Sequence, residues 1–336
     1  MMDSPAPNAR PLAALTGGSG FLGSHIADAL LEAGWRVRCA VRPTSDRRWL
    51  SGKGLEIVDV DLGSPVACQA FVQDAAAVIH CAGLVAADSE AAYFQANVHS
   101  TEVLLEACRE TWGGGAGDRA FLLVSSLAAH GPAGLDRPAR EDDPCRPITG
   151  YGRSKAAAEE LVGRGWPFRC LVLRPPALYG PRDRGFLPLL KAARWGWTAR
   201  FGGPMQGLSL VDGRDAARAA VALVATPTAT GTFFVDDGRA GYTWAGLADA
   251  LGEACGRRVR TVVIPLGLLK TVATVLRPLT RGGMSVLRRD RLRDLEVPGW
   301  VCDGSRLREA TGFEARHRLG PGLADALAFY REEGWL

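Results

Sequence analysis

The feature that most constrains this chain is a cluster of glycines set between two apolar segments. Residues 16–23 read Thr-Gly-Gly-Ser-Gly-Phe-Leu-Gly and follow an apolar run at residues 12–15. Residues 21–33 then carry apolar side chains at three- and four-residue intervals and stop before Gly34. This pattern predicts a strand, a tight turn and a helix that ends at Gly34.

The spacing of Gly17, Gly20 and Gly23 indicates that this turn holds a dinucleotide. A tight turn needs a residue without Cβ, a pyrophosphate needs a bare backbone, and helix–strand contact needs a small residue. The start of the helix offers N–H groups and the positive end of its dipole to the phosphates. We therefore predict cofactor binding by these glycines, with Phe21 and Leu22 in the first turn of the helix.

Strands and helices alternate along the first half of the chain. Strands are expected at residues 37–41, 56–60, 75–79, 121–124 and 168–173, and helices at residues 66–72, 91–109 and 152–162. Short apolar strands separated by helices form a parallel sheet covered on both faces, and right-handed crossovers wind it in both directions. The predicted fold class is α/β, a Rossmann-type doubly wound parallel sheet with a smaller C-terminal substrate lobe.

The domain boundaries follow from where this alternation begins and loosens. Residues 1–11 are polar and proline-rich and are expected to form a flexible leader. Residues 12–180 form the predicted NAD(P)-binding domain, and residues 208–240 return to it. Residues 181–207 and 241–336, in which the segments are less regular, form the predicted substrate-binding lobe.

Composition excludes several other classes of protein. The formal charge of +4, from 40 basic and 36 acidic residues, is too balanced for a nucleic-acid partner. The eight cysteines form no C-x-x-C pair and have no histidine at zinc-ligand spacing, so we expect no metal and buried, reduced thiols in a cytoplasmic protein.

The end of the second predicted strand should contact the ribose of the adenosine. An acidic residue there favours NAD(H), but residues 37–41 are followed by Arg42. A guanidinium group can bind a 2′-phosphate through paired hydrogen bonds, so NADP(H) is favoured and NAD(H) is the alternative. Arg42 could instead be a solvated charge at the strand end.

Tyr151 and Lys155 are four residues apart and would lie on one face of a helix. Reducing a carbonyl creates an alkoxide that must be protonated, and a tyrosine with a pKa of roughly 10 does this poorly. A neighbouring ammonium group lowers that pKa, and the same lysine can hold the nicotinamide ribose. Ser125 and Ser126 follow the strand at residues 121–124, and a serine hydroxyl there can donate a hydrogen bond to the carbonyl oxygen.

Several motifs now occur in a characteristic order along the chain. Besides the glycine turn they are Asp61-Leu62, Cys81-Ala82-Gly83, Asn97, Ser125-Ser126, Tyr151-x-x-x-Lys155 and Arg174-Pro175-Pro176. Together they resemble the extended short-chain dehydrogenase/reductase family, within the NAD-dependent epimerase/dehydratase superfamily.

This resemblance implies roles for further residues. Asp61 and Leu62 would flank the adenine, Ala82 and Gly83 would line the cofactor after the fourth strand, and Pro175 and Pro176 would back the nicotinamide. Ser126 fits the catalytic hydroxyl better than Ser125, and Asn97 fits the helix position that supports Lys155. Asn97 could also be a plain helix-surface amide. By analogy, a homodimer could form through the helices that carry Asn97 and Tyr151.

The family includes two kinds of substrate specificity. Sugar-nucleotide relatives typically have Asn where this chain has Ala177, and often Tyr where it has His130. Val41-Arg42-Pro43 and Arg174-Pro175-Pro176 instead resemble the branch of dihydroflavonol reductases and 3β-hydroxysteroid dehydrogenases. His130 itself is expected to be a structural hydrogen-bonding residue.

Apolar residues in the lobe agree with an apolar substrate. They are Trp195, Trp197, Phe201, Met205 and Leu208, and they form either a substrate pocket or simply the core of the lobe. Residues 266–279 are amphipathic and precede five arginines, so this stretch is either a solvated helix face or a peripheral membrane contact.

We therefore expect an NADP(H)-dependent oxidoreductase that interconverts a secondary alcohol and a ketone. Its substrate would be apolar and steroid-, terpenoid- or flavonoid-like. The alternatives are a nucleotide-sugar epimerase or dehydratase with bound NAD, and a non-catalytic protein that senses NAD(P).

Overall fold

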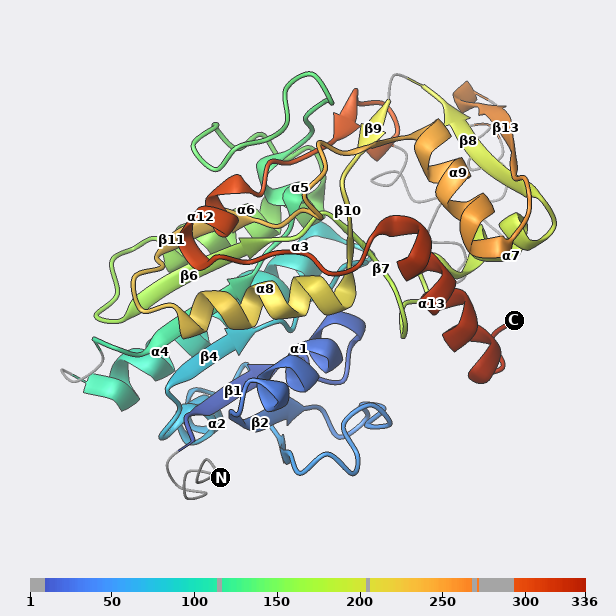
Figure 1. Ribbon diagram of the computed structural model, residues 1–336. Coiled ribbons are helices and arrows are strands. Elements are labelled where there is room, and N and C mark those ends of the chain that lie inside the picture. Colours follow the sequence, from blue (N-terminus) through green and yellow to red (C-terminus); the bar gives the residue numbers. More distant parts are fainter. Residues whose placement is uncertain (1–9, 114–116, 204–205, 268–270, 272–292) are drawn as a thin grey trace.

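A computed structural model describes residues 10–113, 117–203, 206–267, 271 and 293–336. Its centre is a seven-stranded parallel sheet with the strand order β11-β6-β5-β4-β1-β2-β3 (Figure 1). In chain order the strands are β1 (Leu12–Thr16), β2 (Arg36–Val41), β3 (Glu56–Asp59), β4 (Ala77–His80), β5 (Ala120–Val124), β6 (Arg169–Arg174) and β11 (Gly231–Phe234). The predicted doubly wound α/β fold is confirmed.

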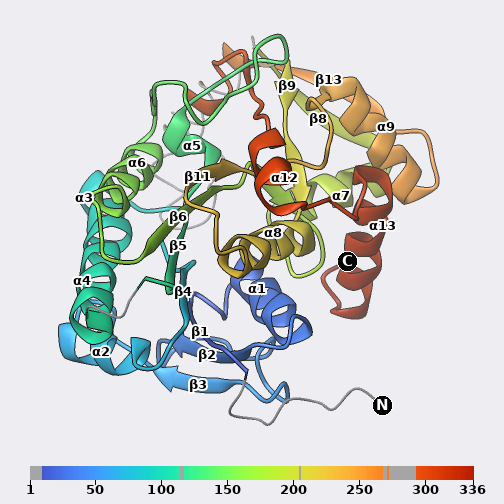
Figure 2. The same ribbon diagram turned by 60° about the vertical axis from the view of Figure 1, so that its left-hand side comes forward.

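Helices cover both faces of this sheet (Figure 2). One face packs against α1 (Phe21–Glu32), α8 (Gly213–Ala225) and α12 (Ser305–Thr311); the other packs against α2 (Pro65–Val72), α4 (Ser100–Trp112) and α6 (Gly150–Val162). The central strands β1, β4 and β5 are buried along their whole length. This explains why their sequences are continuous apolar runs without alternation.

The strand order reverses between β1 and β4, because the chain moves outward from β1 to β3 and then crosses back to β4. At such a point the loops that leave the two carboxyl ends diverge and open a crevice for a ligand. The glycine turn leaves β1 here, and Cys81-Ala82-Gly83 leaves β4. The topology therefore brings these two predicted cofactor segments together.

The second part of the molecule is built from short strands and helices around its own apolar core, which includes Tyr179, Leu251 and Leu323. Its helices are α7 (Leu187–Arg194), α9 (Trp244–Cys255) and α13 (Leu319–Glu332). Its strands pair as β7 (Ala177–Tyr179) with β10 (Leu210–Asp212), β8 (Trp197–Gly202) with β13 (Arg260–Pro265), and β9 (Gly207–Leu208) with both β12 (Tyr242–Thr243) and β14 (Gly299–Trp300).

Two expectations about side-chain burial are wrong. Trp195 and Trp197 are 80% and 48% exposed, so they are neither core residues nor the walls of a closed pocket. They lie where α7 passes into β8, at the edge of the lobe. Met205 and the side chain of Phe201 lie outside the described part of the chain. The eight cysteines are free thiols, but Cys145 is exposed rather than buried.

A single glycine determines how closely α6 approaches α5 (Leu127–His130). A Cβ at Gly152 would lie 2.3 Å from the backbone oxygen of Ala128. Only glycine therefore allows the first turn of α6, which carries Tyr151, to lie against the segment that follows Ser126.

We predict that Gly152→Ala lowers the free energy of unfolding by about 1–3 kcal/mol, the usual cost of overpacking. It should also lower turnover, because α6 must move away from α5. Gly163→Ala is the matched control, since a Cβ at Gly163, just after the same helix, comes no closer than 3.6 Å to its neighbours. Denaturant titrations and activity assays test both variants, and equal stability of the two would contradict the prediction.

Candidate active site

The glycine turn is pressed against the segment that follows β4. Gly17 has a φ of +72°, and a Cβ there would lie 2.6 Å from the backbone nitrogen of Ala82. A Cβ at Gly23 would lie 2.0 Å from the backbone oxygen of Gly17. Gly20 precedes α1 and caps it without a side chain, so the first N–H groups of the helix face a bare loop. This cradle fits a pyrophosphate, which needs close backbone approach and unshielded donors.

The loop after β2 is rich in arginines, which differ in whether their guanidinium groups bind a carboxylate. Arg47 donates a hydrogen bond to Asp59 over 2.5 Å, and Arg48 donates to Asp46 over the same distance. Arg42 is exposed, and its backbone N–H donates to the Ser45 hydroxyl over 3.1 Å. Asp59, which lies beside Val41 in the sheet, is thus engaged in an ion pair with Arg47.

Lys155 lies on α6 and is buried. Its Nζ donates a hydrogen bond of 2.7 Å to the backbone oxygen of Val124, at the end of β5. Burial lowers its pKa to about 8, while the nearby groups Cys81 and Glu159 oppose this shift. At neutral pH the site therefore contains a desolvated ammonium group, fixed beneath the carboxyl edge of the sheet.

Tyr151 lies one helical turn before Lys155, in the first turn of α6. The hydroxyl oxygen of Thr149 accepts the N–H of Gly152 over 3.0 Å and caps the helix at this point. The Tyr151 ring is half-buried and packs against Tyr93, with ring centroids 5.9 Å apart. The helix and its cap thus hold the tyrosine and the lysine on one face, as their spacing predicts.

Asn97 lies in a π-helical turn, Gln95–His99, between α3 (Glu90–Phe94) and α4. Its side chain accepts the N–H of Leu84 over 2.8 Å, donates to the backbone oxygen of Leu84 over 3.1 Å, and donates to the hydroxyl of Ser154 over 2.9 Å. It is buried, so the reading of Asn97 as a surface amide is wrong. Asn97 ties the loop after β4 to the helix that carries Lys155.

The two serines after β5 have different partners. The Ser125 hydroxyl donates to the Glu159 carboxylate, which also holds Arg174 in a buried ion pair of 2.6 Å. Ser126 accepts the N–H of Ala128 over 3.1 Å and begins α5. Since Ser125 is engaged with Glu159, Ser126 is the better placed of the two to meet a substrate, and its catalytic role stays a prediction.

The remaining predicted cofactor residues lie at the same edge of the sheet. Asp61 accepts the N–H of Gly63 over 2.9 Å in the loop after β3, and Leu62 packs against the apolar core beside it. Pro175 and Pro176 are buried after β6, where the Pro175 oxygen accepts the N–H of Leu127 over 2.9 Å. A Cβ at Gly83 would lie 3.6 Å from Lys155 Nζ. Their contacts with a cofactor stay predictions.

Sequence reasoning missed His80, the last residue of β4. The Ser100 hydroxyl donates to the oxygen of Ala96 over 2.6 Å, so its contact of 3.3 Å with His80 Nε2 requires the proton on that nitrogen. His80 Nδ1 then accepts from the Thr16 hydroxyl over 2.7 Å. Burial, assisted by the charge of Lys155, lowers the His80 pKa to about 3, so the ring stays neutral.

The Thr16 oxygen in turn accepts the N–H of Ala82 over 3.1 Å. His80 therefore fixes the ends of β1 and β4 and the start of α4 relative to one another. Its sequence signal was a polar residue closing an apolar strand directly before Cys81-Ala82-Gly83. Glu159, also missed, has the signal of an acid four residues after Lys155 on the same helix.

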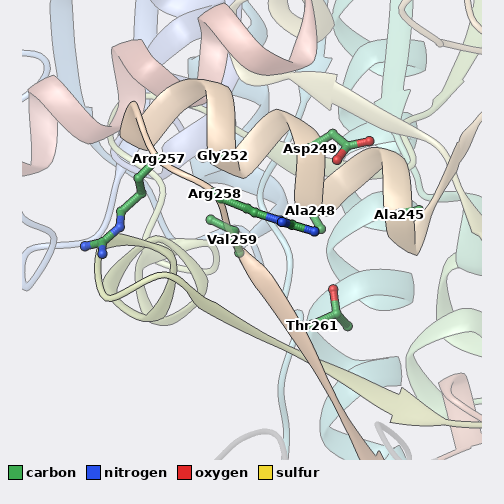
Figure 3. Close-up of a pocket in the computed structure, with 8 residues that line it drawn as sticks. All are labelled: Ala245, Ala248, Asp249, Gly252, Arg257, Arg258, Val259 and Thr261. Atoms are coloured by element: carbon green, nitrogen blue, oxygen red, sulfur yellow. The ribbon is translucent and has the colours of Figure 1, made fainter.

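His130 and a surface hollow on the lobe do not belong to this site. His130 is buried, contacts the oxygen of Gly131 over 3.1 Å and packs edge-on against Phe234, which agrees with a structural role. A surface hollow of about 460 Å³ lies between α9 and β13 (Figure 3). None of its lining residues belongs to the predicted site. Across the residues that the structure describes, no group of His, Cys, Asp and Glu could hold a metal ion.

A glycine cradle at the switch point of a parallel sheet, next to a helix that carries Tyr151 and Lys155, defines an NAD(P)-dependent oxidoreductase. Residues 13–234 match the model of the NAD dependent epimerase/dehydratase family. The chain belongs to this family, and the resemblance to its extended short-chain dehydrogenase/reductase members is confirmed.

Individual relatives differ in how much of the chain they match. The chain is 31% identical to the ceramide reductase of Caulobacter vibrioides over 334 residues, which cover 98% of both proteins. It is 28% identical to a decarboxylating sterol-4-alpha-carboxylate 3-dehydrogenase of Dictyostelium discoideum, over 60% of this chain and 64% of the relative. Among solved structures, a UDP-glucose 4-epimerase of Thermotoga maritima with UDP-glucose is similar, with a TM-score of 0.75 and 22% identity, over 96% of this chain and 99% of the epimerase. At that identity the likeness shows the fold alone.

The buried ammonium group predicts a pH dependence of stability. The pKa of Lys155 is about 8 in the folded protein, whereas the usual pKa of lysine is 10.5. Between pH 8 and pH 10.5 the unfolded chain therefore keeps the lysine proton that the folded protein has lost. Stability therefore increases as the pH rises through this window. Relative to Lys155→Met, the free energy of unfolding of the wild type should increase by roughly 2–3 kcal/mol between about pH 7 and pH 10. Denaturant titrations of both proteins measure this difference, and a difference that does not change with pH would contradict it.

Proposed function

We propose that this protein reduces a ketone to a secondary alcohol, or catalyses the reverse reaction, with NADP(H) on an apolar, lipid-like substrate. The observation that carries the proposed reaction is the buried ammonium group of Lys155, one helical turn from Tyr151. A desolvated cation at this place favours the phenolate form of the tyrosine, which general acid–base catalysis requires.

Each residue then has a defined task. The nicotinamide, when bound, supplies or accepts the hydride. Ser126 donates a hydrogen bond to the substrate oxygen, and Tyr151 gives its hydroxyl proton to that oxygen as the carbonyl becomes an alcohol. Lys155 stabilises the resulting phenolate, and Asn97 keeps the loop after β4 in place beside the lysine. In the reverse direction Tyr151 accepts the proton.

The substrate class rests on the relatives. The ceramide reductase aligns with nearly the whole chain, including the lobe outside the sheet. The sterol dehydrogenase is likewise named for a lipid substrate. Ceramides have secondary hydroxyl groups, so a hydride-transferring reductase would act on a precursor with a ketone at such a carbon. A long-chain acylated amino ketone is therefore the first substrate to test, followed by steroid, terpenoid and flavonoid ketones.

The nucleotide-sugar alternative has support from solved epimerases through the fold alone, and from a UDP-glucose 4-epimerase of Azospirillum brasilense that is 31% identical over 52% of this chain and 50% of the epimerase. Ala177 is exposed at the start of β7 and offers only a methyl group. A cofactor-sensing protein without turnover would have no need to bury a lysine beside Tyr151. Both alternatives are tested by the same assays, with UDP-sugars included in the substrate panel.

Tyr151→Phe removes the proton donor and keeps the ring. We predict that turnover falls by about 100-fold or more, the scale of lost general acid–base catalysis, while NADPH still binds. Tyr93→Phe is the matched control, because this neighbouring ring packs against Tyr151. Steady-state rates and NADPH fluorescence titrations measure the two effects, and near-normal turnover of Tyr151→Phe would overturn the mechanism.

Arg42→Ser tests the cofactor preference. Losing a paired hydrogen bond to a 2′-phosphate should raise KM for NADPH about tenfold and leave KM for NADH nearly unchanged. Arg36→Ser is the control, since Arg36 is exposed at the opposite end of β2. A wild-type enzyme that prefers NADH tenfold, or an Arg42→Ser variant that weakens both cofactors equally, would refute NADP(H) specificity.

A further inference from the structure

The β8–β13 edge of the lobe exposes a group of apolar side chains. Trp195, Trp197, Val262 and Val263, called here the tryptophan patch, are 80%, 48%, 45% and 54% exposed. Figure 1 shows β8 and β13 at the outer edge of the lobe, far from the seven-stranded sheet. Half of the large apolar residues that are exposed in the described chain gather in this patch. Clustering of this kind marks an interaction surface.

Local structure explains why these residues stay exposed. Among the strands that the structure describes, β8 and β13 pair only with each other, in a parallel register that places Trp197 beside Arg260 and Ala199 beside Val262. Thr198, which points to the other side of β8, is buried. β8 therefore packs on the lobe through the side that carries Thr198 and presents Trp197 on its other side, where Val262 of β13 also lies. β13 is exposed along most of its length, so Val263 is exposed on the opposite side of that strand from Val262.

Basic side chains border the tryptophan patch. Arg194 directly precedes Trp195, while Arg257, Arg258 and Arg260 lead into β13. Arg260 lies over the Trp197 ring at 5.9 Å, and Arg257 donates to the backbone oxygen of Arg194 over 2.6 Å. Within the described ranges, none of these four guanidinium groups has a carboxylate at ion-pair distance. Asp249 lines the neighbouring hollow together with Arg257 and Arg258 (Figure 3).

We propose that the tryptophan patch docks the protein on the surface of an anionic lipid bilayer. Indole rings favour the membrane–water interface, the valines add apolar area, and the four arginines meet lipid phosphates. Four apolar side chains fall short of the roughly 800 Å² that each partner contributes to a stable protein interface. A bilayer, by contrast, can be bound by a few inserted side chains that are assisted by charge.

This surface differs from the membrane contact expected from the sequence. That expectation rested on residues 266–279 and the arginines after them, most of which lie outside the described residues. In the part of the chain that the structure describes, no helix has the length and apolar character needed to cross a bilayer. The proposed contact is therefore peripheral and rests on β8, β13 and the residues beside them.

Cosedimentation with vesicles tests the proposal without any enzymatic turnover. We expect the full chain to bind vesicles that contain about one third phosphatidylglycerol and not vesicles of phosphatidylcholine alone. Trp195→Ser and Val262→Ser should each weaken binding at least about fivefold. The double variant Arg257→Ser/Arg258→Ser should weaken it about tenfold or more, and high salt should have a similar effect.

The matched controls are Val66→Ser, an apolar residue on α2 that is 75% exposed, and Arg137→Ser, an exposed arginine far from β13 in the chain. Neither should change binding. Thermal melts establish that all variants fold. Absence of binding to the anionic vesicles, or equal losses in the control and patch variants, would overturn the proposal. Because binding is measured directly, failure of the proposed catalytic reaction would not be mistaken for failure of docking.

Discussion

The buried ammonium group of Lys155 is the constraint around which the site is arranged. A desolvated cation needs a fixed acceptor, and the oxygen of Val124 provides it at the end of β5. The same charge disfavours a second one nearby, which contributes to the low pKa of His80. A neutral His80 can then accept from Thr16 and donate to Ser100, so the charge on one helix influences the hydrogen bonds that join β1, β4 and α4.

The π-helical turn at Asn97 serves the same arrangement. A π turn widens a helix locally and redirects a side chain, and such turns are frequent at functional sites. Here it directs the Asn97 amide to both backbone groups of Leu84 and to Ser154. A Cβ at Gly83 would lie 2.8 Å from Asn97 Oδ1, so this close contact also depends on glycine. Together, Gly83 and the π turn allow the loop after β4 to lie against α6, the helix that carries Lys155.

The sequence predicts those parts of the site whose chemistry is local. The glycine turn and the Tyr151–Lys155 pair are each formed by residues close in sequence, so their spacing alone specifies their geometry. His80 and Glu159 were not predicted because their hydrogen-bond partners are far away along the chain. Thr16 lies 64 residues from His80, and Ser125 lies 34 residues from Glu159. The exposure of Trp195 and Trp197 was not predicted for a similar reason. Whether an aromatic residue is core or surface depends on which elements pack over it, and β8 has β13 as its one partner among the described strands.

A lipid-like substrate would give that exposure a physical meaning. Each CH₂ group that leaves an apolar phase for water costs about 0.8 kcal/mol, so a long-chain ketone is scarcely present as a free monomer. An enzyme for such a molecule gains more from meeting it at a lipid surface than from binding it tightly out of water. The aromatic and basic edge lies on the lobe that is expected to hold the substrate, whereas the cofactor cradle belongs to the sheet. This division would let one part of the chain contact lipid while the other exchanges a water-soluble dinucleotide.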